Sequence, residues 1–277
     1  MYHRFVLKKI NNKKVSNIPS LEDKSKKKYK GEKLFSVSYP NIFLLGRKKS
    51  GKTTVIFNIL KNCIDKDTII YIFSSTYNKD AGWISIMKYF KKLGNHIEAF
   101  HNISENKKSN LEPILEMLNE ESLEEEEKEM GKESIDINYI AIDSLDEEEK
   151  PRKRKKRKLA PEIVFIFDDQ GTALRNQEVG DLMKKNRHYK SMVITSSQYL
   201  HDITPQSIRQ LDYLLVFNGL QDDKLIKIHK GMDLPMDLNQ LKSLYKHATS
   251  KPYCFLYISA NTKDGYRMCF NKKYFIK

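Results

Sequence analysis

The stretch from Phe43 to Leu60 constrains the fold of this chain more than any other part of the sequence. It reads FLLGRKKSGKTTVIFNIL: a short apolar segment, a glycine-flanked turn, and a run whose apolar residues recur at intervals of three and four. The apolar segment predicts a buried strand over residues 41–46, and the periodic run predicts an amphipathic helix over residues 53–63. Between them, residues 46–53 match the spacing G-x-x-x-x-G-K-[ST] of a phosphate-binding loop at every fixed position.

The residue types of this loop suit the binding of a nucleoside triphosphate. The two glycines let the backbone bend so that successive N–H groups converge on a phosphate. The start of the following helix adds the positive end of its dipole. We expect Lys52 to reach the β- and γ-phosphates and the Thr53 hydroxyl to ligate Mg²⁺. The full set of predicted nucleotide-binding residues is Gly46, Ser50, Gly51, Lys52, Thr53 and Thr54.

Two acids stand where the strand predicted over residues 163–168 ends, in the stretch IVFIFDDQ: Asp168 is its last residue and Asp169 follows. Asp168 suits a Mg²⁺ site through the water shell of the ion, and Asp169 is placed to orient or deprotonate the attacking water. Without the phosphate-binding loop, the two acids would be better interpreted as caps of the following turn. With the loop present, nucleotide hydrolysis is the better interpretation.

Three further residues are candidates for a catalytic site. Gln198 follows the strand predicted over residues 191–196 and occupies the place of a γ-phosphate sensor. This role requires that strand to lie between the loop strand and the Asp-Asp strand, as in ring-forming motor ATPases. Arg187 and Arg209 each precede a strand, and either can project into a neighbouring subunit's nucleotide site. The alternatives are a turn residue for Gln198 and a solvated helix end for each arginine.

Apolar and amphipathic runs alternate along the rest of the chain. Further strands are predicted over 68–74, 96–101 and 213–217, and further helices over 83–93, 175–187, 204–210, 221–230 and 236–247. Residues 253–270 alternate around a turn at Lys263-Asp264-Gly265 and predict a C-terminal β-hairpin. The alternation predicts an α/β fold, a P-loop NTPase with a mainly parallel, RecA-like sheet flanked by helices.

Charge and composition divide the chain into an arm, a domain and an insertion. Residues 1–39 form a basic N-terminal arm, with one strand expected around Arg4–Ile10. Residues 40–277 form the P-loop domain, which a charged insertion at 103–160 interrupts. The insertion carries a net charge of −12 over 103–150 and +7 over 151–158. Its low apolar content predicts a mostly disordered surface loop, with a short helix formed by Leu111, Ile114, Leu115 and Leu118 before the acids.

The net charge of +14 lies mainly on the core and the arm. It predicts a polyanionic partner, most often nucleic acid, and the alternative is a lysine-rich composition with no ligand. No apolar run approaches the ~20 residues of a membrane helix, and the three cysteines form no metal-binding spacing. We therefore expect an intracellular, soluble protein without a membrane segment. The basic run at 152–158 is interpreted as a nuclear import signal or a solvated run, and less readily as a DNA clamp.

Five stretches of the chain together resemble the poxvirus-type genome-packaging ATPases of the FtsK–HerA superfamily, which occur in large DNA viruses, virophages and polinton-like transposons. They are FLLGRKKSGKTT, IVFIFDDQG, NRHYKSMVITSSQ, TPQSIRQLDYLLVFN and YCFLYISANTKDGYRMCF. The resemblance covers approximately 40–102 and 160–277. The wider superfamily usually has glutamate at the place of Asp169, whereas the poxvirus-type branch commonly has Asp-Asp.

This resemblance implies roles for the residues that match and partners for the chain. Lys52 and Thr53 would bind ATP and its metal, Asp168 would hold Mg²⁺, Asp169 would activate water, and Gln198 would sense the γ-phosphate. The resemblance implies a homo-oligomeric ring that threads double-stranded DNA into a capsid, with capsid or portal proteins as partners. It also implies a place in the host cytoplasm or nucleus, or in the virion.

Two other classes of function stay open. A P-loop GTPase needs N-K-x-D after the metal-binding strand, but YNKDAG lies before that strand and its Asp80 comes one place too early. A small-molecule kinase needs a lid over an acceptor pocket, and no segment suggests one. The last alternative is a non-enzymatic, basic DNA-binding scaffold with a vestigial nucleotide site, which the intact Lys52, Thr53 and two aspartates disfavour.

Overall fold

The structure, a computed structural model, describes residues 28–106, 108–133, 158–260 and 264–275. Within these residues, nine strands form one large sheet. Its strands are β1 (Asn41–Leu45), β2 (Ile69–Ser74), β3 (Ile97–Phe100), β6 (Ile163–Asp168), β7 (Ser191–Ser197), β8 (Tyr213–Phe217), β9 (Phe255–Ser259), β10 (Tyr266–Met268) and β11 (Lys272–Tyr274). A separate two-stranded ribbon consists of β4 (Ser104–Glu105) and β5 (Lys108–Ser109).

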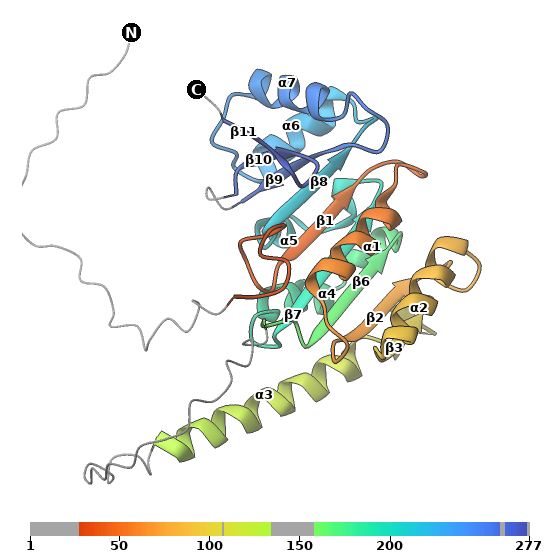
Figure 1. Ribbon diagram of the computed structural model, residues 1–277, viewed down its shortest axis with the longest axis vertical. Coiled ribbons are helices and arrows are strands. Elements are labelled where there is room, and N and C mark those ends of the chain that lie inside the picture. The colour runs from red at the N-terminus through yellow and green to blue at the C-terminus, as the bar shows by residue number, and fades with distance from the viewer. Residues whose placement is uncertain (1–27, 107, 134–157, 261–263, 276–277) are drawn as a thin grey trace, which may run out of the picture.

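The large sheet has the order β11-β10-β9-β8-β1-β7-β6-β2-β3 (Figure 1). The six strands from β8 to β3 run parallel, and β9, β10 and β11 continue the sheet antiparallel. This arrangement confirms the predicted fold class, including the C-terminal hairpin. Strand β7 lies between β1 and β6, which is the order that the predicted sensor position of Gln198 requires.

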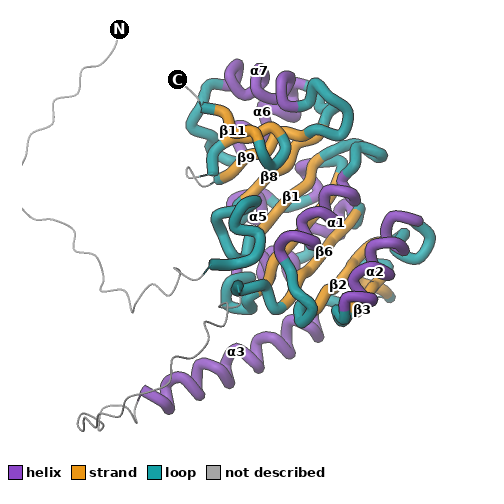
Figure 2. The backbone as a smooth tube through the Cα atoms, in the orientation of Figure 1, coloured by secondary structure: helices purple, strands orange, loops and turns teal. Residues whose placement is uncertain are grey.

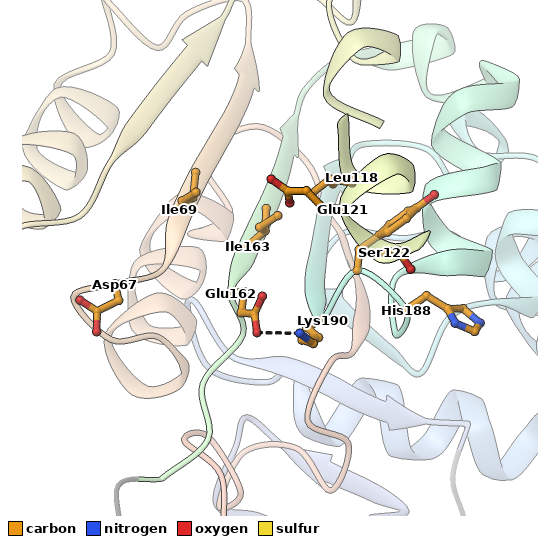
Figure 3. A pocket seen from close by; sticks show the side chains of 10 residues that line it. Asp67, Ile69, Leu118, Glu121, Ser122, Glu162, Ile163, His188 and Lys190 are labelled. Carbon is orange, nitrogen blue, oxygen red and sulfur yellow. Dashed lines mark ion pairs between the residues drawn. The ribbon is translucent and has the colours of Figure 1, made fainter. Parts of the chain in front are cut away.

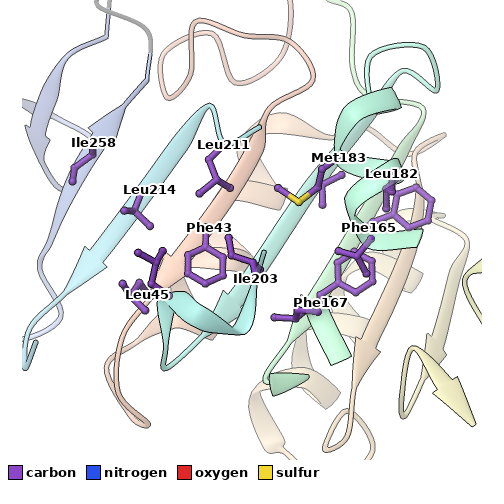
Figure 4. Packing of buried hydrophobic residues seen from close by; sticks show 14 of the residues in the cluster. Phe43, Leu45, Phe165, Phe167, Leu182, Met183, Ile203, Leu211, Leu214 and Ile258 are labelled. Atoms are coloured by element: carbon purple, nitrogen blue, oxygen red, sulfur yellow. The ribbon is translucent and has the colours of Figure 1, made fainter. Parts of the chain in front are cut away.

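Helices cover both faces of the sheet. They are α1 (Lys52–Cys63) and α2 (Ala81–Leu93) on one face, and α4 (Gln177–Lys185), α5 (Pro205–Arg209), α6 (Asp222–Gly231) and α7 (Leu238–Ala248) on the other. Side chains of β1 alternate between the two faces: Ile42 and Leu44 pack with α1 and α2, and Phe43 and Leu45 pack in the opposite cluster (Figure 4). Burial on both faces explains why this strand reads as a continuous apolar run.

The parallel strands define two edges of the sheet, which we call the carboxyl edge and the amino edge. The segments that leave β1, β6 and β7 lie at the carboxyl edge, and the segments that enter these strands lie at the amino edge. In register, Leu45 lies beside Ser197, and Asp168 lies beside Ser196. The phosphate-binding loop, the two acids and Gln198 therefore emerge at the same edge, which is where open α/β sheets bind ligands.

Most element boundaries lie within a few residues of the predicted ones. The helix expected over 175–187 is shorter and begins at Gln177. Asn176, with a ψ of 141°, separates it from a 3₁₀ helix over Gly171–Arg175. Strands β4, β5 and β11 have two or three residues each, which is too few to establish an alternating pattern. The sequence therefore does not indicate them.

The described end of the predicted arm packs on the domain. Phe35 is 1 % exposed, and its ring centroid lies 4.7 Å from that of Tyr213. The amide of Ser36 donates hydrogen bonds of 2.9 Å to the Tyr213 hydroxyl and to a carboxylate oxygen of Asp264. Phe35 and the buried Asp264 thus attach this end of the arm to the domain. The basic residues around it had indicated a separate arm. The strand expected around Arg4–Ile10 lies outside the described residues.

The charged insertion begins with ordered structure, which differs from the expectation of a mostly disordered loop. Ile103, Leu111 and Leu118 are buried in the cluster that contains Phe43. Helix α3 (Glu112–Glu133) continues well past the predicted short helix and projects from the body of the domain (Figures 1 and 2). Glutamate is a good helix former, so the acids prolong a helix that its apolar start anchors. Residues 134–157 lie outside the described part, and none of the described helices is long and apolar enough to cross a membrane.

Candidate nucleotide-binding site

The loop between β1 and α1 bends through two residues with positive φ. Lys49 has a φ of 64°, and Gly51, the N-cap of α1, has a φ of 96°. A side chain at Gly46 would place its β-carbon 2.7 Å from Cβ of Phe217, so glycine is required where the loop leaves the strand. The bent loop leads directly into the amino end of α1, whose first N–H groups have no partners within the helix. This geometry can bind an anion.

The ammonium group of Lys52 folds back over the loop. Its Nζ donates to the carbonyl oxygens of Gly46 at 2.8 Å and of Arg47 at 3.1 Å. Burial lowers the pKa of Lys52, and the charges of Asp168 and Asp169 oppose that change. The ammonium therefore lies between neutral carbonyls and two acids, where phosphate oxygens can take the place of the carbonyls.

Asp168 is buried at the end of β6 and is 8 % exposed. Its Oδ2 accepts a hydrogen bond of 2.7 Å from the indole Nε1 of Trp83, and its Oδ1 accepts one from the Ser196 hydroxyl. Burial raises the pKa of Asp168, while these two hydrogen bonds and the charge of Lys52 oppose the increase. Two donors from different elements thus hold the carboxylate in one orientation.

Asp169 follows in a left-handed backbone conformation, with a φ of 53°. Such a conformation is uncommon for residues other than glycine and clusters at functional sites. The turn leaves Asp169 exposed while Asp168 is buried. Oδ1 of Asp169 accepts a 3.4 Å hydrogen bond from Nε2 of Gln198. The predicted water-activating acid and the predicted sensor are therefore neighbours.

These groups line a cleft of about 840 Å³ at the carboxyl edge. This volume is ample for a nucleotide. The predicted residues that line the cleft are Ser50, Gly51, Lys52, Thr53, Thr54, Asp168, Asp169 and Gln198. Gly46 is joined to this group by the hydrogen bond that its carbonyl oxygen accepts from Lys52. The structure thus brings together every predicted site residue except the two arginines.

Four further residues at the site have no motif that points to them. Thr76 and Asp80 line the cleft from the segment between β2 and α2, and Tyr253 lines it from the segment before β9. Trp83 reaches Asp168 from α2. Asp80 alone carries a local signal, because it caps α2 by accepting hydrogen bonds from the amides of Gly82 and Trp83.

The polar atoms at the cleft fit a magnesium ion and a phosphate ligand. The Thr53 hydroxyl and the carboxylates of Asp168 and Asp169 are hard oxygen donors, the type that Mg²⁺ prefers. Within the described residues, the Ser50 hydroxyl is buried and has no hydrogen-bond partner. Buried polar atoms normally have a partner, and an oxygen of a phosphate in the loop would give this hydroxyl one.

Arg187 and Arg209 lie at the amino edge, away from the cleft of their own chain. Each precedes a parallel strand. Arg187 donates a 3.3 Å hydrogen bond to Oδ1 of Asp212, and its side chain is 68 % exposed. Burial raises the pKa of Asp212, and the amide of Asn41 and the charge of Arg187 oppose that change. A role for either arginine in a neighbouring subunit's site stays a prediction.

Comparison with solved structures finds chains of similar fold. The genome packaging NTPase B204 from Sulfolobus turreted icosahedral virus 2, in complex with AMP, is 16 % identical with a TM-score of 0.50, over 87 % of this chain and 100 % of that chain. B204, the DNA-packaging ATPase from Sulfolobus turreted icosahedral virus, is 16 % identical with a TM-score of 0.48, over 80 % and 93 % of the two chains. ATPases 2 and 3 of EssC from Geobacillus thermodenitrificans are 13 % identical with a TM-score of 0.47, over 80 % and 38 %. No protein-family model matches the chain, and no curated protein does.

The fold is that of a P-loop NTPase. The AMP complex of B204, whose whole length the chain covers, has this fold, so the resemblance seen in the sequence is confirmed at the level of the fold. One fold hosts many functions, so activity has to be argued from the site itself.

Proposed function

We propose that this chain is an ATPase that uses ATP hydrolysis to move double-stranded DNA into a viral or virus-like capsid. The observation that carries the proposal is the meeting of Lys52, Thr53, Asp168, Asp169 and Gln198 at one cleft. Phosphoryl transfer to water needs a phosphate cradle, a metal site, a group that activates water and stabilisation of charge on the γ-phosphate. These residues supply one group for each need.

The side chains divide the chemical work according to their surroundings. The loop amides and the Lys52 ammonium hold the triphosphate, and the Ser50 hydroxyl is available to a phosphate oxygen. A bound magnesium ion, held by Thr53 and by Asp168, would neutralise charge on the phosphate oxygens. Exposed Asp169 orients the attacking water or accepts its proton, and Gln198 donates toward the γ-phosphate.

The DNA-moving part of the proposal rests on charge and on kinship of fold. The chain carries +14 although its insertion is acidic, and a basic surface binds DNA through phosphates without reading bases. The B204 chain of the same fold is a genome packaging NTPase. We infer a homo-oligomeric ring around the DNA, with Arg187 or Arg209 reaching a neighbouring cleft and with capsid or portal proteins as partners.

ATP turnover with and without double-stranded DNA tests the proposal. At low salt, DNA is expected to increase turnover, and added salt is expected to reverse the increase because phosphate contacts weaken. Asp169→Asn is expected to abolish turnover but to keep nucleotide binding. Asp223→Asn, an exposed aspartate of α6 outside the cleft, is the matched control.

Each component of the proposal has its own contrary outcome. Turnover that DNA leaves unchanged at low salt would contradict the motor. ATP binding without any turnover, with or without DNA, would instead indicate a vestigial site. A chain that stays monomeric in light scattering with an ATP analogue and DNA would contradict the ring and the arginines acting between subunits.

A further inference from the structure

Tyr253 lies at the cleft in an unusual turn and has no role in the chemistry above. The turn spans residues 251–254 and is closed by a 3.2 Å hydrogen bond from the amide of Cys254 to the carbonyl of Lys251. Pro252 occupies its second position, and Tyr253 has a φ of 63° at the third. Turns with this pattern favour glycine or asparagine at the third position. A large side chain is thus held where the backbone favours a small one.

The ring of Tyr253 rests on the phosphate-binding loop and is otherwise open to solvent. A β-carbon added at Gly51 would lie 3.2 Å from Cδ1 of Tyr253. The residue is nevertheless 73 % exposed, whereas Tyr213 and Tyr257 in the neighbouring strands are completely buried. The ring therefore contributes little to the core. It presents an aromatic surface within the cleft.

The position of Tyr253 in the sheet order indicates which part of a nucleotide would meet it. Asp168 and Gln198 follow β6 and β7, on one side of β1, while Tyr253 precedes β9, on the other side. A triphosphate in the loop has to direct its γ end toward the acids. Its nucleoside end then extends along the edge away from them, toward Tyr253.

We propose that the ring of Tyr253 stacks on the nucleobase of the bound nucleotide. The inference rests on the proposed nucleotide site and adds a residue that selects among nucleotides. An aromatic ring contacts the π face of a base, which every base has and which is larger in purines. Purine triphosphates are therefore expected to bind more tightly than CTP, with little discrimination between adenine and guanine.

Calorimetric titration of the full chain tests this contact with three probes in the presence of Mg²⁺: AMP-PNP, CTP and inorganic tripolyphosphate. Tyr253→Gly removes the ring while suiting the positive φ, so the turn is kept. AMP-PNP affinity is expected to fall about tenfold in this variant, the size of one stacking contact. Tripolyphosphate affinity should not change, and the preference for AMP-PNP over CTP should narrow. Tyr253→Phe keeps the ring and should bind like the parent.

A surface aromatic outside the cleft supplies the control, and three outcomes would overturn the inference. Phe275 is 84 % exposed, and Phe275→Ala should bind all three probes like the parent. Equal AMP-PNP affinity in the parent and Tyr253→Gly would overturn the stacking contact. So would an equal loss for tripolyphosphate, because the ring would then act on the loop. A parent chain that binds neither AMP-PNP nor tripolyphosphate would overturn the proposed function and this inference with it.

Discussion

The two edges of the parallel sheet are formed by the same strands but differ in what their polar groups face. At the amino edge, Asp212 accepts hydrogen bonds from the Asn41 amide and from Arg187, and Asn186 donates to the carbonyl of Tyr39 at 2.7 Å. Within the described residues, a buried polar atom without a hydrogen-bond partner occurs at each edge: Oδ1 of Asn41 at the amino edge and the Ser50 hydroxyl at the carboxyl edge. Ser50, unlike Asn41, lines the cleft. Residues with positive φ lie beside the cleft at Lys49, Gly51, Asp169 and Tyr253, and Lys190 has a positive φ at the amino edge.

The amino edge also has a cavity, and its composition differs from that of the cleft. The cavity measures about 270 Å³ and lies where α3 meets the sheet (Figure 3). Apolar Leu118 and Ile163 line it. So do Lys190 and Glu162, which form an ion pair with 3.2 Å between Nζ and Oε1. These groups hold elements together. At the carboxyl edge, by contrast, the polar groups line a cleft that is large enough for a nucleotide. The two edges therefore differ in whether their polar groups face one another or a space that a ligand can fill.

The largest expected contrast between the edges is in ATP turnover. Lys52→Ala removes the cation over the loop and is expected to lower turnover by about 100-fold or more, because the charge of the phosphates is then poorly stabilised. Lys190→Ala removes a cation at the amino edge and should leave turnover within about twofold, as for other exposed ion pairs. Steady-state kinetics of both variants measure the contrast. Equal losses would show that the edges do not differ in function.

Stability should respond in the opposite way to replacing an acid at each edge. Asp264, at the amino edge, accepts hydrogen bonds from Ser36, Tyr213 and Arg267. Burial by itself would raise the pKa of Asp264, but these hydrogen bonds and the charge of Arg267 outweigh burial and lower it. Asp264→Asn should therefore cost about 2–4 kcal/mol at pH 7. The cost should shrink as the pH falls below about 4, where the carboxylate becomes protonated.

Asp168→Asn is the matched replacement at the carboxyl edge. Because burial raises the pKa of Asp168, its charged form destabilises the ligand-free fold at neutral pH, and stability decreases as the pH rises above the unfolded pKa of about 4. The asparagine variant should thus be at least as stable as the parent at pH 7, and its advantage should vanish in acid. Urea unfolding at several pH values measures both variants. A loss at pH 7 as large as that of Asp264→Asn would contradict the comparison.

A smaller effect is expected when Asp168 keeps its charge but loses the indole donor. Trp83→Phe removes the 2.7 Å hydrogen bond and should lower turnover about tenfold, the usual effect of losing a partner behind a metal ligand. The Mg²⁺ concentration for half-maximal turnover should rise. Phe90→Leu is the control, because Phe90 is buried on the same helix without a hydrogen bond to Asp168. Phe90→Leu should lower stability without changing the Mg²⁺ dependence of turnover. If it shifted that dependence as much as Trp83→Phe does, Trp83 would act through packing alone.

The smallest effect is expected for Arg187→Ala in the isolated chain. Because the Arg187 side chain is 68 % exposed, solvent weakens its pair with Asp212, and the free energy of unfolding should fall by only about 1 kcal/mol. AMP-PNP binding by the monomer should be unchanged, because Arg187 lies at the edge opposite the cleft. Titration and urea unfolding measure both quantities. A clear loss of nucleotide affinity in the monomer would contradict the separation of the two edges.

Local sequence was sufficient to predict the parts of the site whose residues are close together in the chain. The spacing from Gly46 to Thr53 encodes a loop whose partners are its own neighbours, and the apolar run before Asp168 encodes a buried strand. The place of β7 between β1 and β6 was also predicted, because the sensor role of Gln198 at the end of that strand requires this order. Parallel strands then bring their ends to one edge without any further information.

Tertiary structure alone decided which distant residues complete the site. Trp83 meets Asp168 across 85 positions of sequence, and Tyr253 reaches the loop at Gly51 from the far end of the chain. The same holds for Phe35 against Tyr213 and for the start of α3 in the core. Periodicity records that a side chain is buried but not which surface buries it, because packing partners are set by how whole elements meet.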